Sequence, residues 1–191
     1  MHNYEYIIAS LPDLNQDPGK NRDLHVGHVL HEIRERLDGS DRDLLDLLLS
    51  AYEPQNLTED FYRRALSHRN RFIREFFTFD MNLRNAKVVY LNRALGRPEG
   101  QDVMDLDGGE FMEAAAVEEV LAGTDLLARE KGLDDAMWEK IVQITELDVF
   151  DIDVILGFVA RLKIVDRWLQ LDPEKGRELF RKLVEEIRNT R

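Results

Sequence analysis

The chain has 191 residues, the size of a single domain, and it contains no cysteine. Disulfides, thiolate metal sites and cysteine nucleophiles are therefore excluded. The 38 acidic residues outnumber the 26 basic ones and give a formal net charge of −12. No nucleic-acid partner is expected for such an acidic chain, because nucleic-acid binding depends on neutralising phosphates.

The N-terminal residues 4–10 are rich in β-prone side chains and end before Pro12. We expect either one short strand or an extended segment here, and the sequence leaves the two open. Residues 1–10 lack the basic and long apolar regions of a signal peptide, and no stretch reaches the roughly 20 apolar residues that span a membrane. We expect a cytoplasmic protein without direct membrane insertion.

Two helices are predicted in the next part of the chain. The first begins near residues 21–23 and ends at Gly39, because its apolar residues follow the helical period of 3.6. Those apolar residues are Val26, Val29, Leu30, Ile33 and Leu37. The second is a short helix over residues 44–51, with a start signal at Ser40 and a stop at Pro54.

A long helical segment begins at Thr58, an N-cap that acidic residues follow. No glycine or proline interrupts it before Gly96, and a straight helix of that length would measure about 57 Å at ~1.5 Å per residue. A compact domain of this size has a radius of gyration of about 16 Å, so we predict a bend near residues 67–70. Gly96 and Pro98 end the helix, and a loop covers residues 96–109.

Glycines divide the following segment into three predicted helices. They cover residues 110–122, 124–131 and 134–146, and Gly123 and Gly132 separate them.

Residues 149–171 are predicted to form a helix whose apolar side chains surround the axis, and a helix of this kind lies buried. Asp172 and Pro173 then start a last helix that ends near Asn189. Its apolar face consists of Leu179, Phe180, Leu183, Val184 and Ile187. The chain is therefore predicted to be all-α, a single helical domain over residues 1–191 built as a multi-helix bundle around a buried central helix.

His25, His28 and His31 recur every three residues on the first predicted long helix. This spacing can hold a metal ion if a second helix supplies another ligand, whereas the simpler interpretation is an exposed helix face. A small metal-dependent helical enzyme that uses these three residues is therefore one alternative. The sequence contains no Gly-x-Gly-x-x-Gly, Walker A, Gly-x-Ser-x-Gly or His-Glu-x-x-His motif, so we predict no catalytic residue and no cofactor.

Polar side chains interrupt the apolar pattern of the long helical segment. Asp80 and Arg84 are four residues apart within an apolar arc, which is favourable spacing for an ion pair. They form either a structural pair between helices or a polar contact for a partner or ligand. Asn82, Asn85 and Asn92 lie on another flank, where they are either solvated or form a hydrogen-bonding face.

Three segments resemble a bacterial family that is encoded among the subunits of V-type (archaeal-type) ATP synthases. The segments are residues 4–13 (YEYIIASLPD), 76–86 (FFTFDMNLRNA) and 150–168 (FDIDVILGFVARLKIVDRW). The resemblance covers nearly the whole chain and implies that other V-type ATPase subunits are its partners. It implies no particular chemistry.

The run Asp80-Met-Asn-Leu-Arg84, with Arg93 further along the helix, also resembles an element of the ring-capping subunit of V-type ATPases. That subunit is all-helical, has no active site and links the rotor's membrane ring to the central axle, but it is three-fold repeated and far longer.

The resemblance implies a non-catalytic connector at the membrane periphery, a reduced version of the ring-capping subunit, in a complex that transports protons or sodium ions. We expect a partner to contact Asp80, Asn82, Arg84, Asn85 and Arg93. A helical adaptor unrelated to ATPases is the remaining alternative.

Overall fold

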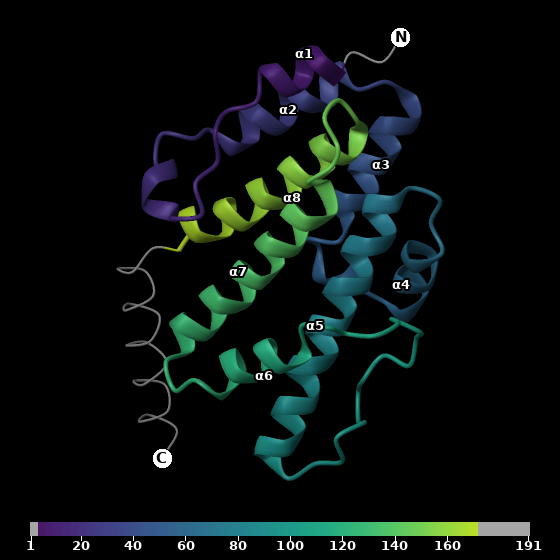
Figure 1. The fold of residues 1–191 in the computed structure, drawn as a ribbon, viewed down its shortest axis with the longest axis vertical. Helices are drawn as coiled ribbons and strands as arrows, with labels where there is room; N and C mark the ends of the chain where they lie inside the picture. Colours follow the sequence, from purple (N-terminus) through teal and green to yellow (C-terminus); the bar gives the residue numbers. More distant parts are fainter. Residues whose placement is uncertain (1–3, 172–191) are drawn as a thin grey trace, which may run out of the picture.

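The chain folds into helices connected by turns and loops, as Figure 1 shows for a computed structural model that describes residues 4–171. Within that range there are eight α-helices and two 3-10 helices, and no strand. The α-helices are α1 (Tyr4–Ala9), α2 (Val26–Arg36), α3 (Gly39–Ser50), α4 (Glu59–Leu66), α5 (Arg71–Leu95), α6 (Ala114–Ala122), α7 (Leu126–Thr145) and α8 (Ile152–Leu169), and the 3-10 helices are η1 (Pro18–Asn21) and η2 (Pro54–Asn56). The predicted all-α class is confirmed.

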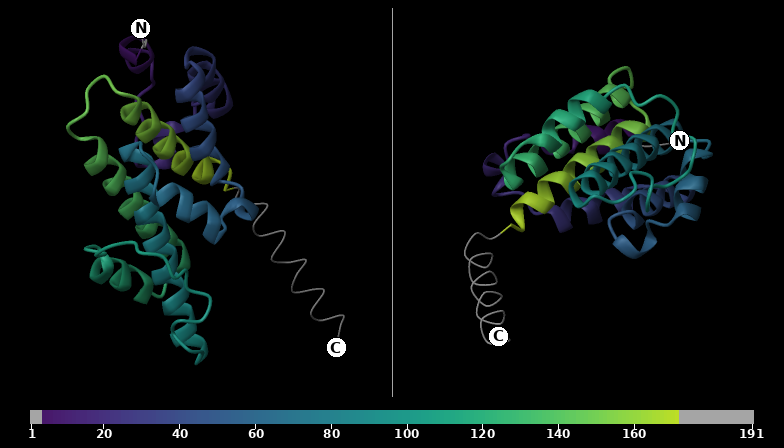
Figure 2. Two further views of the ribbon diagram at one scale, coloured as in Figure 1. Left: turned by 90° about the vertical axis from the view of Figure 1, so that its right-hand side faces the viewer. Right: turned by 90° about the horizontal axis from the view of Figure 1, so that it is seen from below.

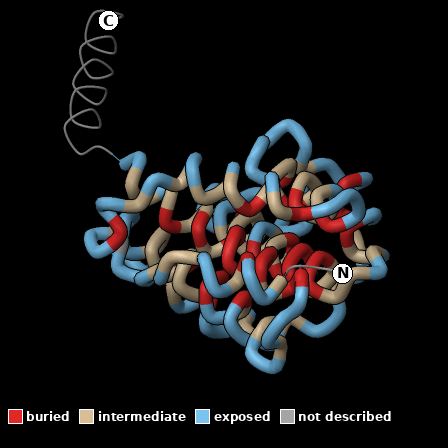
Figure 3. Tube along the Cα trace, turned by 90° about the horizontal axis from the view of Figure 1, so that it is seen from above, coloured by how far each residue is buried: buried red, intermediate tan, exposed pale blue. Residues whose placement is uncertain are grey.

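Helix α8 lies between α7 on one side and α2 and α3 on the other (Figure 2). Its fully buried side chains cover a wide arc around the helix and are Ile155, Leu156, Val159, Ala160 and Leu162. The buried parts of the chain are concentrated at the centre of the molecule (Figure 3). Helix α8 is therefore the central helix that the apolar pattern predicted.

The close packing of α7 on α8 depends on Gly157. A Cβ atom at this position would lie 2.8 Å from Cγ2 of Thr145 and 3.3 Å from Cγ2 of Ile141, both on α7. These separations are shorter than ordinary carbon contacts of about 3.5–4.0 Å. A glycine at this position therefore lets the two helices approach each other.

Aromatic rings attach α4 to the first half of α5. The ring of Phe61 meets the ring of Phe77 edge-to-face, with centroids 5.0 Å apart, and Tyr62 meets Phe77 at 6.4 Å. Such pairs contribute about 0.5–1.5 kcal/mol each beyond the burial of their surface. This packing buries Tyr62 completely and holds its hydroxyl beside α5.

The N-terminal segment is a helix, so the expectation of a strand or an extended segment is wrong. Helix α1 buries Ile7, which is 1% exposed, and packs Tyr4 and Ile8 against the core, where Leu11 joins them just after the helix ends. The hydroxyl of Tyr4 also donates a hydrogen bond of 2.6 Å to Oδ2 of Asp41 on α3. The spacing of these four contacts is helical, and packing on the core outweighs the β-propensity of the individual residues.

The predicted break at Gly132 is absent, because α7 continues through this glycine from Leu126 to Thr145. A Cβ atom on Gly132 would lie 2.7 Å from Cγ1 of Val120 on α6. Gly132 thus gives room to a neighbouring helix instead of ending its own. Helix α6 starts at Ala114, four residues later than predicted.

The boundaries of α2 and α3 also differ from the prediction. The 3-10 helix η1 covers residues 18–21, and α2 begins only at Val26, later than the predicted start near residues 21–23. Gly39 is the first residue of α3, rather than the end of the preceding helix.

The long helical segment is divided into α4 and α5, with residues 67–70 between them. Asn70 caps α5 by accepting a 2.8 Å hydrogen bond from the backbone N–H of Ile73. Its amide Nδ2 donates to Oδ1 of the buried Asp153 at 2.6 Å, which connects the start of α5 to the start of α8.

Two sequence predictions concern other parts of the chain. The last predicted helix, residues 173–189, lies outside the described residues. Among the helices of residues 4–171, none is long and apolar enough to cross a membrane.

Candidate functional site: a groove between α5, α7 and α8

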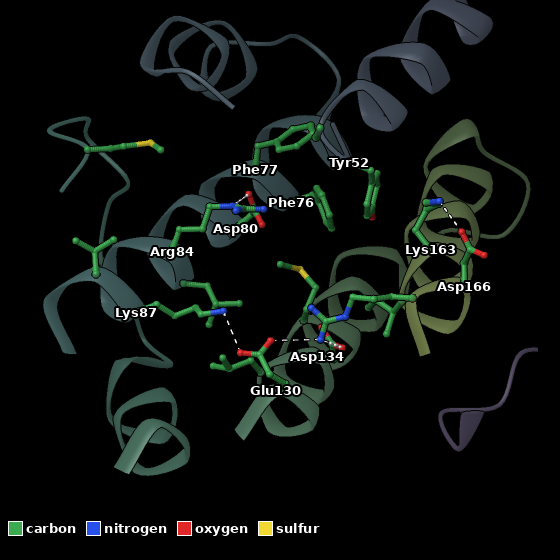
Figure 4. Close-up of a pocket in the computed structure, with 18 of the residues that line it drawn as sticks. Tyr52, Phe76, Phe77, Asp80, Arg84, Lys87, Glu130, Asp134, Lys163 and Asp166 are labelled. Atoms are coloured by element: carbon green, nitrogen blue, oxygen red, sulfur yellow. Dashed lines mark hydrogen bonds and ion pairs between the residues drawn. The ribbon is translucent and has the colours of Figure 1, made fainter. Parts of the chain in front are cut away.

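A groove of about 690 Å³ lies between α5, α7 and α8, with the residues that follow α3 at one end (Figure 4). Much of its lining is apolar and includes Phe76, Phe77, Leu83, Leu133, Met137 and Ile164. The charged residues of the lining are Asp80, Arg84, Lys87, Glu130, Asp134, Lys163, Asp166 and Arg167. Four carboxylates and four cations thus accompany the apolar surface.

Each helix contributes one face to this groove. Helix α5 supplies residues at positions 76, 80, 83, 84, 87 and 91, a spacing of three and four that keeps side chains on one side of a helix. Helix α7 supplies positions 130, 133, 134 and 137, and α8 supplies positions 163, 164, 166 and 167, followed by its C-cap residue Gln170. The groove therefore exists only where three helical faces, distant in sequence, meet.

Asp80 forms the expected pair with Arg84, whose Nε lies 2.8 Å from Oδ2 of Asp80. The hydroxyl of Tyr62 on α4 donates a hydrogen bond to the same oxygen. The Asp80 side chain is only 13% exposed, so both donors compensate for its loss of hydration. Burial, together with the negative charge of Asp80, raises the pKa of the Tyr62 phenol far above its usual value. Tyr62 therefore stays protonated as a donor.

A second charge network joins α5, α7 and α8. Nζ of Lys87 lies 3.4 Å from Oε1 of Glu130, and Arg167 lies 3.5 Å from Oε2 of the same carboxylate. Arg167 also contacts Oδ2 of Asp134 at 2.5 Å, and Nε1 of Trp168 donates to that oxygen at 2.7 Å. Burial raises the pKa of Asp134 although Arg167 and Trp168 act in the opposite direction.

The far end of the groove is formed by α8 and the residue Tyr52. Nζ of Lys163 lies 2.7 Å from Oδ2 of Asp166 and 5.5 Å from the centre of the Tyr52 ring. Figure 4 shows Lys163 pointing toward Asp166, as Lys87 points toward Glu130. Every charged residue of the lining is thus paired with another residue of the lining.

The lining combines an apolar surface with ionisable side chains. Its carboxylates and cations are held in ion pairs with one another. An apolar surface with paired charges fits a segment that brings apolar side chains of its own.

The asparagines of α5 bind the chain's own loop, which covers residues 97–113. Nδ2 of Asn82 donates to the carbonyl oxygen of Gly108, and Nδ2 of Asn85 donates to that of Met104, both at 3.1 Å. Oδ1 of Asn85 accepts the Met104 N–H at 3.0 Å. Asn92 is buried and donates to the carbonyls of residues 99 and 101. Of the two alternatives left by the sequence, a solvated face and a hydrogen-bonding face, the structure shows the second, and the partners of the three asparagines belong to the chain's own loop.

The remaining predicted contact residues divide between two places. Asp80 and Arg84 line the groove, whereas Arg93 lies near the end of α5, outside it. Nε of Arg93 is 2.9 Å from Glu99, and its Nη1 is 2.8 Å from Glu118 on α6. The five predicted partner contacts thus do not form one surface.

Residues 55–190 match the model of a family described as proteins of unknown function, DUF2764. The chain belongs to this family. No curated protein and no solved structure matches it. The part of this DUF2764 member that the family model covers includes α4 to α8, and so it contributes every lining residue of the groove except Ala51 and Tyr52.

In this DUF2764 chain the three histidines of the predicted metal site are exposed, His25 as the N-cap residue of α2 and His28 and His31 within it. Residues 4–171 contain no group of three or more His, Cys, Asp or Glu side chains that could hold a metal ion. The alternative of a metal site therefore gains no support from the arrangement around α2.

Sequence reasoning missed the contributions of α7 and α8 to the groove. The positions 163, 166, 167 and 170 are polar and recur every three or four residues, which marks one polar stripe on an otherwise apolar helix. That polar stripe is the sequence pattern that could have indicated the contribution of α8 to the groove. On α7, Glu130 and Asp134 also lie four residues apart, but nothing in the sequence indicates that the two helices face each other.

Proposed function

We propose that this chain is a non-catalytic helical subunit or accessory protein of a V-type ATPase, a reduced version of the ring-capping subunit that connects the rotor ring to the central axle. It binds a partner segment in the groove between α5, α7 and α8. The observation that supports this proposal is the lining of the groove, which is largely apolar and has all its charges paired internally.

Internal pairing matters for the energy of docking. A charge that is buried by a partner costs several kcal/mol unless it keeps a good counter-ion. Asp80 and Asp134 already have their cations, so an apolar segment can cover them without leaving a charge unpaired. The apolar surface that the segment buries contributes about 25 cal/mol per Å². Leu91, which is 52% exposed, extends this apolar surface along α5.

The connection to a V-type ATPase is supported by the sequence resemblance. Two of the three segments that resemble the ATPase-associated family, residues 76–86 and 150–168, lie on α5 and α8. They supply Asp80 and Arg84 from α5, and Lys163 and Arg167 from α8, to the lining of the groove. Two of the three segments that carry the resemblance therefore contribute side chains to the proposed docking surface.

Purification from cells that produce a V-type ATPase tests the proposal. A tagged chain isolated at low salt is expected to retain head, axle or ring subunits, and to lose them as the salt concentration rises because the chain is acidic. The proposal fails if no subunit of the head, axle or ring is recovered at low salt.

A matched pair of variants tests the role of the groove. Leu91→Asp places a charge on its apolar surface, whereas Leu126→Asp changes a leucine that is 70% exposed and lies outside it. Both positions are on the surface, so neither change should disturb the fold. Only Leu91→Asp should reduce the recovery of ATPase subunits. Recovery of proteins unrelated to the ATPase, sensitive to the same change, would indicate the adaptor alternative.

A further inference from the structure

The α7–α8 loop, residues 146–151, connects the ends of two helices and has the sequence ELDVFD. It contains none of the glycine, proline, serine and asparagine residues that are usual in a turn. Three of its side chains are large, apolar and exposed to solvent: Leu147 is 89% exposed, Val149 65% and Phe150 55%. Single exposed apolar residues are normal on a protein surface, whereas three within four positions indicate a contact surface.

Polar contacts on both sides of these apolar residues hold the loop in place. The backbone N–H of Asp148 donates to the Thr145 carbonyl at 3.1 Å, and the Asp148 carboxylate pairs with Arg71 on α5. Asp151 caps α8 by accepting the backbone N–H of Asp153 at 3.2 Å. The loop therefore presents its apolar side chains from a fixed turn, so little conformational entropy is lost when a partner covers them.

The charges within the loop and beside it are mostly negative. Arg71 pairs with Asp148 and, at 3.6 Å, with Asp153. Within residues 4–171, no cation pairs with Glu146 or Asp151, the exposed residues at the two ends of the loop. The apolar side chains thus lie between two carboxylates that face solvent.

The helix next to the loop adds to this negative charge. Burial and the contact with Asp41, followed by the charges of Asp151 and Asp38, raise the pKa of the Tyr4 phenol on α1. One phenol is therefore within electrostatic reach of carboxylates from the starts of α3 and α8. A surface that complements this end of the molecule is positively charged.

We propose that the α7–α8 loop is a second docking site, which inserts Leu147, Val149 and Phe150 into an apolar pocket surrounded by lysine and arginine residues on a partner protein. Aromatic residues are enriched at protein interfaces, where the partner removes them from water. The carboxylates beside them orient the partner and select a basic one. They also disfavour two other occupants, because an anionic lipid surface repels them and a symmetric contact with a second copy brings carboxylates together.

The loop and the groove lie at opposite ends of the α7–α8 pair. In the left view of Figure 2 the loop projects from the body of the molecule. Along α8, the distance from Asp151 to Lys163, where the lining of the groove begins, is about 18 Å at ~1.5 Å per residue. The chain can therefore hold two partners at a fixed separation. This consequence rests on the function proposed above, whereas docking of the loop does not.

A peptide helix with leucine on one face and lysine on the other imitates the partner and serves as the probe. Fluorescence anisotropy at low salt measures its binding to the purified chain, in the Leu91→Asp background so that the groove does not capture it. Leu147→Ser/Val149→Ser is expected to raise the dissociation constant at least about tenfold. Leu126→Ser/Leu127→Ser, whose leucines are 70% and 62% exposed on α7, should change it less than about twofold. Equal effects of the two pairs would overturn the proposal.

A second set of variants tests the role of the carboxylates. Glu146→Gln/Asp151→Asn removes the charges at the two ends of the loop, and asparagine still caps α8. The affinity for the same peptide should fall at least about threefold and depend less on salt. Glu119→Gln/Asp125→Asn, which removes an exposed charge and the N-cap charge of α7, should have a smaller effect. An equal loss in both would indicate a general attraction to the acidic chain and contradict the proposal.

Two further measurements address the other occupants. If Leu147→Ser/Val149→Ser abolishes co-sedimentation of the chain with vesicles of phosphatidylcholine and phosphatidylglycerol, the loop binds membranes and the proposal is wrong. The proposal is equally wrong if sedimentation velocity shows a dimer that this variant dissociates. We expect neither result. None of these measurements uses an ATPase subunit, so the proposed function and the docking of the loop fail in different experiments.

Discussion

The hydroxyl of Tyr62 on α4 donates a hydrogen bond to Oδ2 of Asp80 on α5, the oxygen that also contacts Arg84. Tyr62 is completely buried, and Asp80 lines the groove. The packing of α4 on α5 thus places the Tyr62 hydroxyl where it holds Asp80, a charged residue of the proposed docking surface, in position.

Tyr62→Phe keeps the aromatic packing and removes this donor. Hydrogen bonds to charged groups contribute about 1.5–3 kcal/mol, and Asp80 retains Arg84, so we expect a loss of about 1–2 kcal/mol in the free energy of unfolding. Urea unfolding measures it, with Tyr6→Phe as the control, since Tyr6 is 57% exposed. Equal stability of Tyr62→Phe and the natural chain would show that the hydrogen bond contributes nothing.

Asn85→Ala is expected to loosen the loop that follows α5. The change removes the acceptor of the Met104 N–H and the donor to the Met104 carbonyl. We expect hydrogen exchange of the Met104 amide to accelerate by about tenfold, corresponding to a loss of ~1.4 kcal/mol in local stability. The amide of Gly109, which donates to Asp107 in the same loop, provides an internal control. Unchanged exchange at Met104 would contradict the role given to Asn85.

Two glycine-to-alanine changes should have opposite signs. In Gly157→Ala the new methyl group meets Thr145 at 2.8 Å, so overpacking between α7 and α8 should cost about 1–3 kcal/mol of stability. In Gly27→Ala nothing lies within 4 Å of the new atom, so the higher helix propensity of alanine should stabilise α2 by about 0.5 kcal/mol. Thermal or urea unfolding distinguishes the two, and a loss of stability in both would refute the distinction.

The free energy of unfolding of the natural chain, compared with that of Asp134→Asn, should increase as the pH falls. Burial raises the pKa of Asp134 in the folded state, so the folded chain binds its proton more tightly than the unfolded chain does. Its contribution is therefore fully present below the unfolded pKa of about 3.9 and is lost as the pH rises through the folded value. Urea unfolding of both proteins between pH 4 and 7 measures the difference. A difference that is constant or grows with pH would contradict the assignment.

Helix identity could be predicted from the sequence wherever apolar periodicity and burial agree, as in α8. The prediction of helices failed at residues 4–10, where β-prone side chains obscured the helical spacing of Tyr4, Ile7, Ile8 and Leu11. It failed again at Gly132, because a glycine that makes room for Val120 looks the same in sequence as one that ends a helix. Both errors arise from tertiary contacts, which local preferences do not contain.

The groove could be predicted only in part for a related reason. The pair of Asp80 and Arg84 is local, at a spacing of four, and was visible in the sequence. The contacts of Lys87 with Glu130, and of Arg167 with Glu130, join residues more than 30 positions apart. Such contacts depend on how α5, α7 and α8 are arranged, which the periodicity of each helix does not determine.

A photo-reactive phenylalanine analogue in place of Leu91 tests the central claim most directly, because this residue is exposed and lines the groove. After irradiation of cells that contain a V-type ATPase, mass spectrometry should identify crosslinks to a subunit of that complex, and the same analogue at Leu126 should yield few. The absence of every ATPase subunit among the crosslinked proteins would contradict the proposed function.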